Sequence, residues 1–284
     1  MVLIGQPVRV ADLQTPSGAD IDGLAMDLLD AFEERRTIPL PTSWFPEFDT
    51  EAAYAVLDRI DEHRRKRGWR PAGWKIGFTN RGLWPLYRVD RPMWASVWNE
   101  TVVHAVGSAS VSVGQFVQPR LEPEIVLGLR GPVPLVDDPV EIVQAVEWVA
   151  PGFEIVQCLF RDWRFTAPDC TAAFGLHGGL VVGEAVASDH FRPVELARSL
   201  AQLEVALSRD GEIVDRGSGS NVLGSPLLAL SHLARGLAER GVTLNAGDIV
   251  TTGTLTDAWP LEPDSSWRAT YLGMPFGALA LAVA

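Results

Sequence analysis

Two glutamates separated by one proline lie in a strongly apolar segment, QPRLEPEIVLGL, over residues 118–129. In an extended chain, side chains two residues apart point to the same face, so Glu122 and Glu124 are expected side by side. Neighbouring carboxylates repel each other and raise each other's pKa. An apolar strand accepts such a pair only if a cation lies between them, and an Arg, a Lys or a metal ion could take that place. The alternatives are an edge strand with two solvated glutamates or a salt bridge to Arg120.

The composition describes an ordinary soluble globular protein. The chain has 284 residues, of which 47% are hydrophobic and 21% charged, enough for one large domain or two unequal ones. A formal net charge of -12 argues against binding to nucleic acid or to an anionic membrane surface. The two cysteines, Cys158 and Cys170, form no CxxC pair, which indicates a reducing compartment without disulfides or zinc-thiolate sites. No signal-peptide pattern or membrane-length apolar run is present, so a cytoplasmic protein is expected.

Two helices are predicted near the start of the chain, over residues 20–36 and 49–68. The second opens on acidic residues and closes on basic ones and a glycine, as the helix dipole favours. Its basic run, RRKR, is expected to be a solvated last turn. From residue 71 the chain changes to short apolar runs separated by Gly, Pro and Asn, which is typical of a β-rich region. The sequence therefore predicts an N-terminal helical segment, residues 1–70, and a β-rich, metal-binding catalytic domain, residues 71–284.

The β-rich part is expected to combine strands with two helices. Strands are predicted over residues 73–80, 101–106, 124–129, 152–160, 178–183 and 248–255, a hairpin with Asp-Gly at its turn over 203–217, and helices over 139–150 and 224–241. No Gly-rich phosphate loop follows a strand and no G-x-S-x-G elbow occurs. Rossmann, P-loop and α/β-hydrolase folds are therefore not supported, and the pattern predicts an α+β protein.

Three carboxylates stand out because each opens or lies within an apolar strand: Glu122, Glu124 and Glu154. A carboxylate buried in such a setting needs a partner, a proton or a metal. Three oxygen ligands suit a hard divalent ion such as Mg²⁺ or Mn²⁺, whereas no suitably spaced His pair favours zinc. Lys75, in GWKIGF, also lies among apolar neighbours and is either snorkelling to the surface or functional. Near the three carboxylates, it could hold a substrate carboxylate or stabilise a developing enolate.

Further candidates follow the third glutamate. Small residues surround His177 and leave room for a ligand, although a structural histidine is the alternative. Arg161 and Arg164 lie shortly after Glu154 and could clamp a substrate carboxylate. An ion pair between Arg161 and Asp162 is equally compatible with the sequence.

Five stretches, taken together and in this order, resemble the fumarylacetoacetate hydrolase superfamily: GWKIGFTN, EPEIVLGL, GFEIVQ, GSGSNVLGSPLLALSHLA and LNAGDIVTTGTLTDA. The branch they resemble holds the 2-keto-4-pentenoate hydratases and 4-oxalocrotonate decarboxylases. The resemblance implies a mixed β-roll core with Mg²⁺ or Mn²⁺ on Glu122, Glu124 and Glu154. It also implies that Lys75 is a catalytic residue that contacts the substrate, and it places Thr254, in the last stretch, among the substrate-binding residues.

The resemblance further implies that a 2-oxo acid binds the metal through its carboxylate and 2-oxo oxygen, so that an enolate becomes accessible. Such a site can hydrate, decarboxylate or cleave its substrate. In the hydratases of this branch, the stretch matching DCTAAFGLHGGLVVG carries an Asp-Asn pair and serines, whereas this chain has Ala173, Phe174, Leu176 and His177 there. His177 is predicted to replace that polar cluster as an acid/base.

The sequence thus predicts a divalent-metal-dependent hydratase that acts on a 2-hydroxypenta-2,4-dienoate-like or related 2-oxo acid. Lys75 and His177 would transfer protons, and Arg161 or Arg164 would bind a second carboxylate. Decarboxylation of an oxalocrotonate-like or oxaloacetate-like diacid is the second candidate. Hydrolysis of an acylpyruvate and a non-catalytic partner subunit or acid-binding protein are the others. A homodimer or larger assembly is expected, because the apolar strands and helix 224–241 leave surface for self-association.

Overall fold

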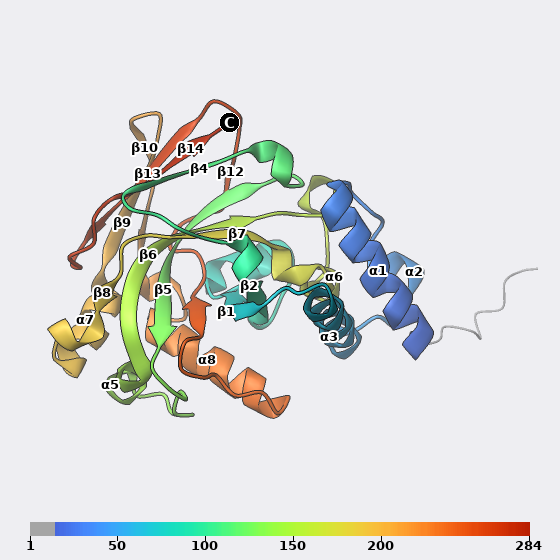
Figure 1. The fold of residues 1–284 in the computed structure, drawn as a ribbon, viewed down its shortest axis with the longest axis horizontal. Helices are drawn as coiled ribbons and strands as arrows, with labels where there is room; N and C mark the ends of the chain where they lie inside the picture. Colours follow the sequence, from blue (N-terminus) through green and yellow to red (C-terminus); the bar gives the residue numbers. More distant parts are fainter. Residues whose placement is uncertain (1–14) are drawn as a thin grey trace, which may run out of the picture.

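A computed structural model describes residues 15–284 of the chain. Residues 1–14, where the sequence shows no signal-peptide pattern, lie outside the described residues. Three helices form the N-terminal part, at the right of Figure 1: α1 (Gly18–Glu34), α2 (Pro41–Trp44) and α3 (Thr50–Lys66). Ser17 caps α1 in a capping box with Asp20, and Asp49 caps α3. The two helices predicted over residues 20–36 and 49–68 are therefore present.

A large curled sheet makes up the centre of the molecule (Figure 1). Its strand order is β2-β1-β11-β5-β6-β7-β3, with β12 pairing to β5 and β8 pairing to β6. The bounds are β1 (Pro71–Gly77), β2 (Met93–Trp98), β3 (Val102–His104), β5 (Arg120–Leu129), β6 (Val146–Val156), β7 (His177–Val182), β8 (Val186–Ala187), β11 (Ile249–Thr251) and β12 (Trp259–Pro260).

A second sheet of five strands has the order β10-β9-β13-β14-β4. The strands are β4 (Ser108–Val111), β9 (Glu204–Arg209), β10 (Glu212–Ser218), β13 (Ser266–Leu272) and β14 (Leu279–Val283). The predicted hairpin is formed by β9 and β10, and both Asp210 and Gly211 at its turn have positive φ, as a tight hairpin turn requires.

The remaining helices are short except for α7 and α8. They are α4 (Trp84–Tyr87), α5 (Pro139–Ile142), α6 (Ala167–Ala172), α7 (Pro193–Gln202) and α8 (Pro226–Glu239). Single 3₁₀ turns are η1 (Arg81–Leu83), η2 (Asn99–Thr101), η3 (Val113–Gln115), η4 (Val143–Ala145), η5 (Arg161–Trp163), η6 (Phe174–Leu176), η7 (Ser188–His190) and η8 (Gly219–Asn221). Within the described range, no helix is long and apolar enough to cross a membrane.

Strand β5 divides its side chains between two environments. Leu121, Ile125 and Leu127 join the main hydrophobic core together with leucines of α7 and α8. By the two-residue period of a strand, Glu122 and Glu124 point to the opposite face. A second core cluster joins the N-terminal helices to α6 and η6 and reaches the end of the sheet. The glutamates therefore lie at the side of the sheet that the N-terminal helices approach.

The prediction of a helix over residues 139–150 is wrong beyond the first helical turn. Helix α5 ends at Ile142, η4 follows, and β6 begins at Val146. Strand β6 pairs with β5 along most of its length, and this pairing buries Val149 and Phe153 in the core. Pairing and burial within the sheet outweigh the helical spacing of the apolar residues. The predicted strand over residues 248–255 is also shorter, because β11 ends at Thr251.

Candidate active site

Three glutamate side chains converge at the centre of the large sheet. The antiparallel register of β5 and β6 places Glu122 directly opposite Glu154, and Glu124 opposite Gly152. One carboxylate oxygen from each of the three glutamates lies within 4.8 Å of the other two. Glu124 and Glu154 are fully buried, and Glu122 is half-buried at the wall of a cavity. The structure thus brings the three predicted carboxylates together.

Their hydrogen bonds leave two buried oxygens unused. Oε2 of Glu124 accepts from the Thr251 hydroxyl and, at 2.8 Å, from the Gly253 N–H. Oε1 of Glu124 and Oε2 of Glu154 have no hydrogen-bond donor among the residues that the structure describes. Buried acceptors without donors are costly and mark a place for a missing partner. An all-oxygen set of this kind fits Mg²⁺ or Mn²⁺.

The pKa values reflect the same lack of positive charge. Burial, and then the charge of Glu154, raise the pKa of Glu122 to about 7 and that of Glu124 well above its usual value. Burial alone would raise the pKa of Glu154 too, but Lys75 and His177 hold it at about 2. A single ammonium therefore stabilises one carboxylate of the three, and the other two still need a cation.

Lys75 on β1 is the cation that the chain itself supplies. Its side chain is buried, and Nζ donates to the Gly175 carbonyl at 2.9 Å. Nζ also lies 3.3 Å from Oε2 of Glu154, an ion-pair contact without hydrogen-bond geometry. Burial alone would lower the pKa of Lys75, but the three glutamates outweigh it and raise the pKa. Lys75 is thus an ammonium at neutral pH, and it lines the cavity beside Glu122.

His177, the first residue of β7, lies behind Glu154 instead of at the cavity wall. Because a carboxylate oxygen can only accept, Nδ1–H of His177 donates to Oε1 of Glu154 at 2.8 Å. The other ring nitrogen, Nε2, is 2.8 Å from the Thr101 hydroxyl. The imidazole is 1% exposed, and burial lowers its pKa. This geometry suits a residue that orients a metal ligand.

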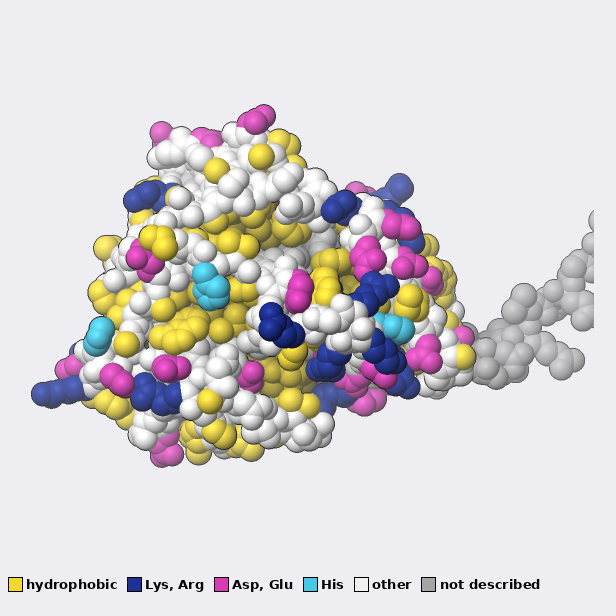
Figure 2. Space-filling model, in the orientation of Figure 1, with side chains coloured by type: hydrophobic (Ala, Val, Ile, Leu, Met, Phe, Trp, Pro, Cys, Tyr) yellow, Lys and Arg dark blue, Asp and Glu magenta, His cyan; other side chains and the backbone are white. Residues whose placement is uncertain are grey.

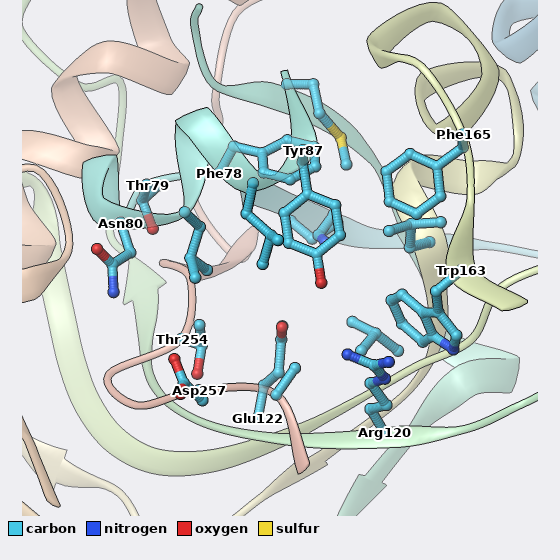
Figure 3. A pocket seen from close by; sticks show the side chains of 17 residues that line it. Phe78, Thr79, Asn80, Tyr87, Arg120, Glu122, Trp163, Phe165, Thr254 and Asp257 are labelled. Atoms are coloured by element: carbon cyan, nitrogen blue, oxygen red, sulfur yellow. The ribbon is translucent and has the colours of Figure 1, made fainter. Parts of the chain in front are cut away.

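The cavity has a volume of about 210 Å³, and aromatic side chains form part of its walls. The Tyr87 and Phe165 rings are stacked with their centroids 5.4 Å apart, and the Arg120 guanidinium lies 4.2 Å from the centroid of the Trp163 ring. Figure 3 shows Glu122 and the Tyr87 hydroxyl pointing toward each other across the cavity, with Arg120 beside Trp163. The cavity is therefore lined by Glu122, by Lys75 and by a second cation, Arg120.

The predicted arginines lie elsewhere. Arg161 and Arg164 are exposed and do not line the cavity. No ion pair between Arg161 and Asp162 occurs in the part of the chain that the structure describes. The Thr254 side chain does line the cavity, and its hydroxyl donates to the Thr256 carbonyl at 2.9 Å.

Sequence reasoning missed Arg120 and the aromatic walls. Arg120 lies two residues before Glu122, so the alternation of a strand places both side chains on the same face. That signal was available in the sequence. The aromatic residues come from separate segments, α4, η5 and the chain after it, so nothing in their spacing connects them.

A curled sheet that holds three clustered carboxylates, a buried lysine and a small cavity is an arrangement that suits a metal-dependent enzyme. Residues 88–278 match the family described as fumarylacetoacetate (FAA) hydrolase C-terminal, and the chain belongs to this family. It is 35% identical to a 4-oxalocrotonate decarboxylase of Pseudomonas sp over 72% of this chain and 77% of that protein. It is 30% identical to a 2-hydroxyhexa-2,4-dienoate hydratase of Comamonas testosteroni over 87% of this chain and 92% of that protein.

Among solved structures, 4-oxalocrotonate decarboxylase from Pseudomonas putida G7, complexed with magnesium and adipate, is similar with a TM-score of 0.87. It is 25% identical, and the match covers 95% of this chain and all of that one. These findings confirm the predicted branch of the family, the α+β fold with a curled mixed sheet and a hydratase-like lyase. The cluster of Glu122, Glu124 and Glu154 could hold a divalent metal.

Proposed function

We propose that this enzyme adds water to a short 2-hydroxydienoic acid, such as 2-hydroxypenta-2,4-dienoate or a related 2-oxo acid. Glu122, Glu124 and Glu154 would hold Mg²⁺ or Mn²⁺. The observation that carries the proposal is the pair of buried carboxylate oxygens without donors beside an ammonium, next to a small cavity. A cavity of about 210 Å³ suits an acid of a few carbon atoms.

Lys75 and the residues of the cavity walls have different roles in the proposed reaction. When bound, the divalent ion would act as a Lewis acid on the 2-oxo acid and favour its enolate. Lys75 is fixed by the Gly175 carbonyl, and its remaining N–H groups can hold the substrate carboxylate or deliver a proton to the carbon chain. Because its pKa is raised, Lys75 stays protonated at neutral pH, as a proton donor must be. The aromatic walls pack along the apolar part of the substrate.

Decarboxylation of an oxalocrotonate-like diacid is the second candidate, and Arg120 favours it. Its guanidinium lies at the cavity wall and can bind a second carboxylate in a bidentate manner. The same role was predicted for Arg161 or Arg164, but both are exposed and outside the cavity lining. We therefore assign the second-carboxylate contact to Arg120.

The product mass distinguishes these functions. The protein with Mg²⁺ is given 2-hydroxypentadienoate, an oxalocrotonate and an acylpyruvate. A product heavier by one water establishes the hydratase, and loss of carbon dioxide establishes the decarboxylase. Two smaller acids would indicate hydrolysis of the acylpyruvate. No conversion of any of the three acids would reject catalysis on these classes and leave an acid-binding or partner protein.

Replacing Arg120 by glutamine should lower kcat/KM for diacids much more than for monoacids. A charge-assisted hydrogen bond contributes about 1.5–3 kcal/mol, so kcat/KM for a diacid should fall about 10- to 100-fold. The value for a monoacid should change less than about threefold, since it lacks the second carboxylate. Arg161→Gln is the matched control and should change neither. Equal losses for both kinds of substrate would show that Arg120 supports the site instead of reading the second carboxylate.

The His177→Ala variant should weaken Mg²⁺ binding about 10- to 100-fold, because Glu154 loses the hydrogen bond that orients it. Turnover should return when Mg²⁺ is raised to saturation. Calorimetric titration and initial rates at rising Mg²⁺ measure both effects. Turnover that stays low at saturating Mg²⁺ would instead support the predicted acid/base role. Unchanged Mg²⁺ affinity together with full turnover would exclude both roles.

We also infer a cytoplasmic protein that self-associates. Cys158 and Cys170 are buried and unpaired, which suits a reducing compartment. Val103 and Val106 are exposed on and beside β3, an edge strand of the large sheet. Figure 2 shows hydrophobic side chains gathered over the sheet, while charged side chains gather over the N-terminal helices. Light scattering after size-exclusion chromatography tests this inference, and a monomer at micromolar concentration would reject it.

A further inference from the structure

A buried arginine joins the N-terminal helices to the catalytic sheet. Arg64 on α3 is 3% exposed, whereas the other residues of the run RRKR are exposed. The expectation that this run is a solvated last turn is therefore wrong for its first residue. The Arg64 guanidinium carbon lies 4.5 Å from the ring centroid of Phe174, 4.7 Å from that of Trp69 and 5.1 Å from that of Phe32.

Arg64 lacks the partner that a buried charge ordinarily has. Over residues 15–284, no carboxylate forms an ion pair with it, and its Nε has no hydrogen-bond acceptor. Burial lowers its pKa to about 10, which leaves it protonated at neutral pH. The charges of Asp61, Glu33 and Glu100 offset part of the cost of burial, and the aromatic rings surround the guanidinium at short range.

One of these rings belongs to a strained segment. The three residues of η6 all have left-handed backbone angles, with φ of 60° for Phe174, 58° for Gly175 and 65° for Leu176. Only glycine adopts this region without steric cost, so two of the three residues must be held there by their surroundings. The Phe174 ring packs against both Arg64 and Phe32, and the ring centroids of Phe174 and Phe32 are 4.9 Å apart.

The strained segment also fixes the catalytic lysine. The Gly175 carbonyl accepts from Lys75 Nζ at 2.9 Å. The segment packs closely on the lysine, because a Cβ added at Gly175 would lie 3.2 Å from Cδ of Lys75 and 3.1 Å from the Ala95 side chain. Leu176, the next residue, lines the cavity. A shift of η6 would therefore move both the hydrogen bond to Lys75 and the cavity wall.

We infer that Arg64 is a positioning residue for catalysis: by clamping the Phe174 ring, it holds the Gly175 carbonyl where it orients Lys75. The N-terminal helices thereby set the geometry of the catalytic amine, although Arg64 itself does not line the cavity. The inference rests on the proposed role of Lys75 in the reaction.

Arg64→Met tests this inference, since it removes the charge but retains a flexible apolar side chain. Arg65→Met is the matched control, because Arg65 is the exposed neighbour and also lies over an aromatic ring, that of Trp98 at 5.5 Å. We expect kcat to fall about tenfold or more in Arg64→Met, with KM and Mg²⁺ affinity within about threefold of wild type. Arg65→Met should keep wild-type kcat. Arg64→Lys, which keeps the charge, should recover part of the loss.

A double-mutant cycle with Phe174→Leu separates this coupling from a general loss of stability. If Arg64 acts through the Phe174 ring, the double variant loses no more kcat than the worse single variant. If the two act independently, their losses multiply, and this would overturn the inference. Thermal melting confirms that each variant is folded at the assay temperature. If Arg64→Met does not fold, Arg64→Lys and Phe174→Leu carry the test.

A second measurement needs no turnover. The chain contains two lysines, Lys75 and the exposed Lys66, so carbamylation by cyanate followed by peptide mass analysis reports each separately. In Arg64→Met, Lys75 should react about tenfold faster relative to Lys66 than in wild type, because its hydrogen bond to Gly175 is loosened. Faster reaction of Lys75 in a protein without lyase activity would reject the proposed function and retain the coupling. An active wild type whose Arg64→Met variant keeps both kcat and Lys75 reactivity would reject the coupling.

Discussion

Replacing Glu124 by glutamine is expected to abolish turnover and metal binding while leaving the metal-free protein as stable as the wild type or more so. The loss follows because Oε1 of Glu124 is one of the two buried oxygens without a donor. Without an anionic ligand, transition-state stabilisation should drop by about 4 kcal/mol or more, which is about a thousandfold in rate. In the metal-free protein, burial raises the pKa of Glu124 well above its usual value, so the uncharged carboxyl is favoured there. Glutamine is also neutral, and its oxygen can still accept from Thr251 and Gly253.

Calorimetric titration with Mg²⁺ and thermal melting with and without the ion measure these effects. The wild type should be stabilised by about 2.7 kcal/mol when Mg²⁺ is a hundred times its Kd, and Glu124→Gln should show no such gain. Glu147→Gln is the control, because Glu147 is an exposed glutamate of β6. Wild-type Mg²⁺ affinity in Glu124→Gln would place the metal elsewhere. A much less stable metal-free variant would show that Glu124 is ionised and paired without a metal.

The carboxylate pair and the buried lysine could be predicted because each depends on local rules. The two-residue period of a strand places Glu122 and Glu124 on one face whatever the rest of the fold. Glu154 and Lys75 could be predicted as well, because each is a charged residue among apolar neighbours in the sequence. The distance between Glu154 and the pair could not be predicted, because it depends on the register of β5 and β6. The sequence also favoured a helix over residues 139–150, where the structure has the beginning of β6.

The residues that line the cavity were harder to predict from the sequence. Arg161 and Arg164 were favoured because they follow Glu154 closely along the chain, yet both are exposed and neither lines the cavity. Residues that are close in sequence need not be close in space once a strand ends and the chain turns. Arg120 reaches the cavity because it shares a strand face with the glutamates, a relation that the sequence does contain. The aromatic partners of Arg120 become neighbours only through the tertiary fold.

His177 illustrates that the sequence can make a residue a candidate without defining its role. The glycines around it indicated room for a ligand, and the structure fills that room with other groups. Thr101 lies on one side of the imidazole and Glu154 on the other. Both partners come from distant segments, so the sequence could not separate a group that transfers protons from one that supports a metal ligand.

The Lys75→Met variant is expected to lose turnover about a thousandfold while binding Mg²⁺ at least as tightly as the wild type. Catalysis suffers because the ammonium at the cavity wall is the proton donor of the proposed reaction. Metal affinity should hold or rise, because a competing cation 3.3 Å from Oε2 of Glu154 has been removed. The metal-free variant should also melt at a lower temperature, since the three carboxylates lose the charge that offsets their repulsion.

Lys66→Met is the natural control, because Lys66 is the other lysine of the chain and lies exposed in an ion pair with Glu62. It should keep wild-type turnover and affinity. Tight Mg²⁺ binding together with lost turnover in Lys75→Met would separate the metal site from the proton donor. Lost Mg²⁺ binding would mean that Lys75 holds the glutamates in place, and its part in the reaction would then be structural. Retained turnover would exclude Lys75 as the proton donor and leave Tyr87, whose hydroxyl faces Glu122 across the cavity (Figure 3), as the candidate.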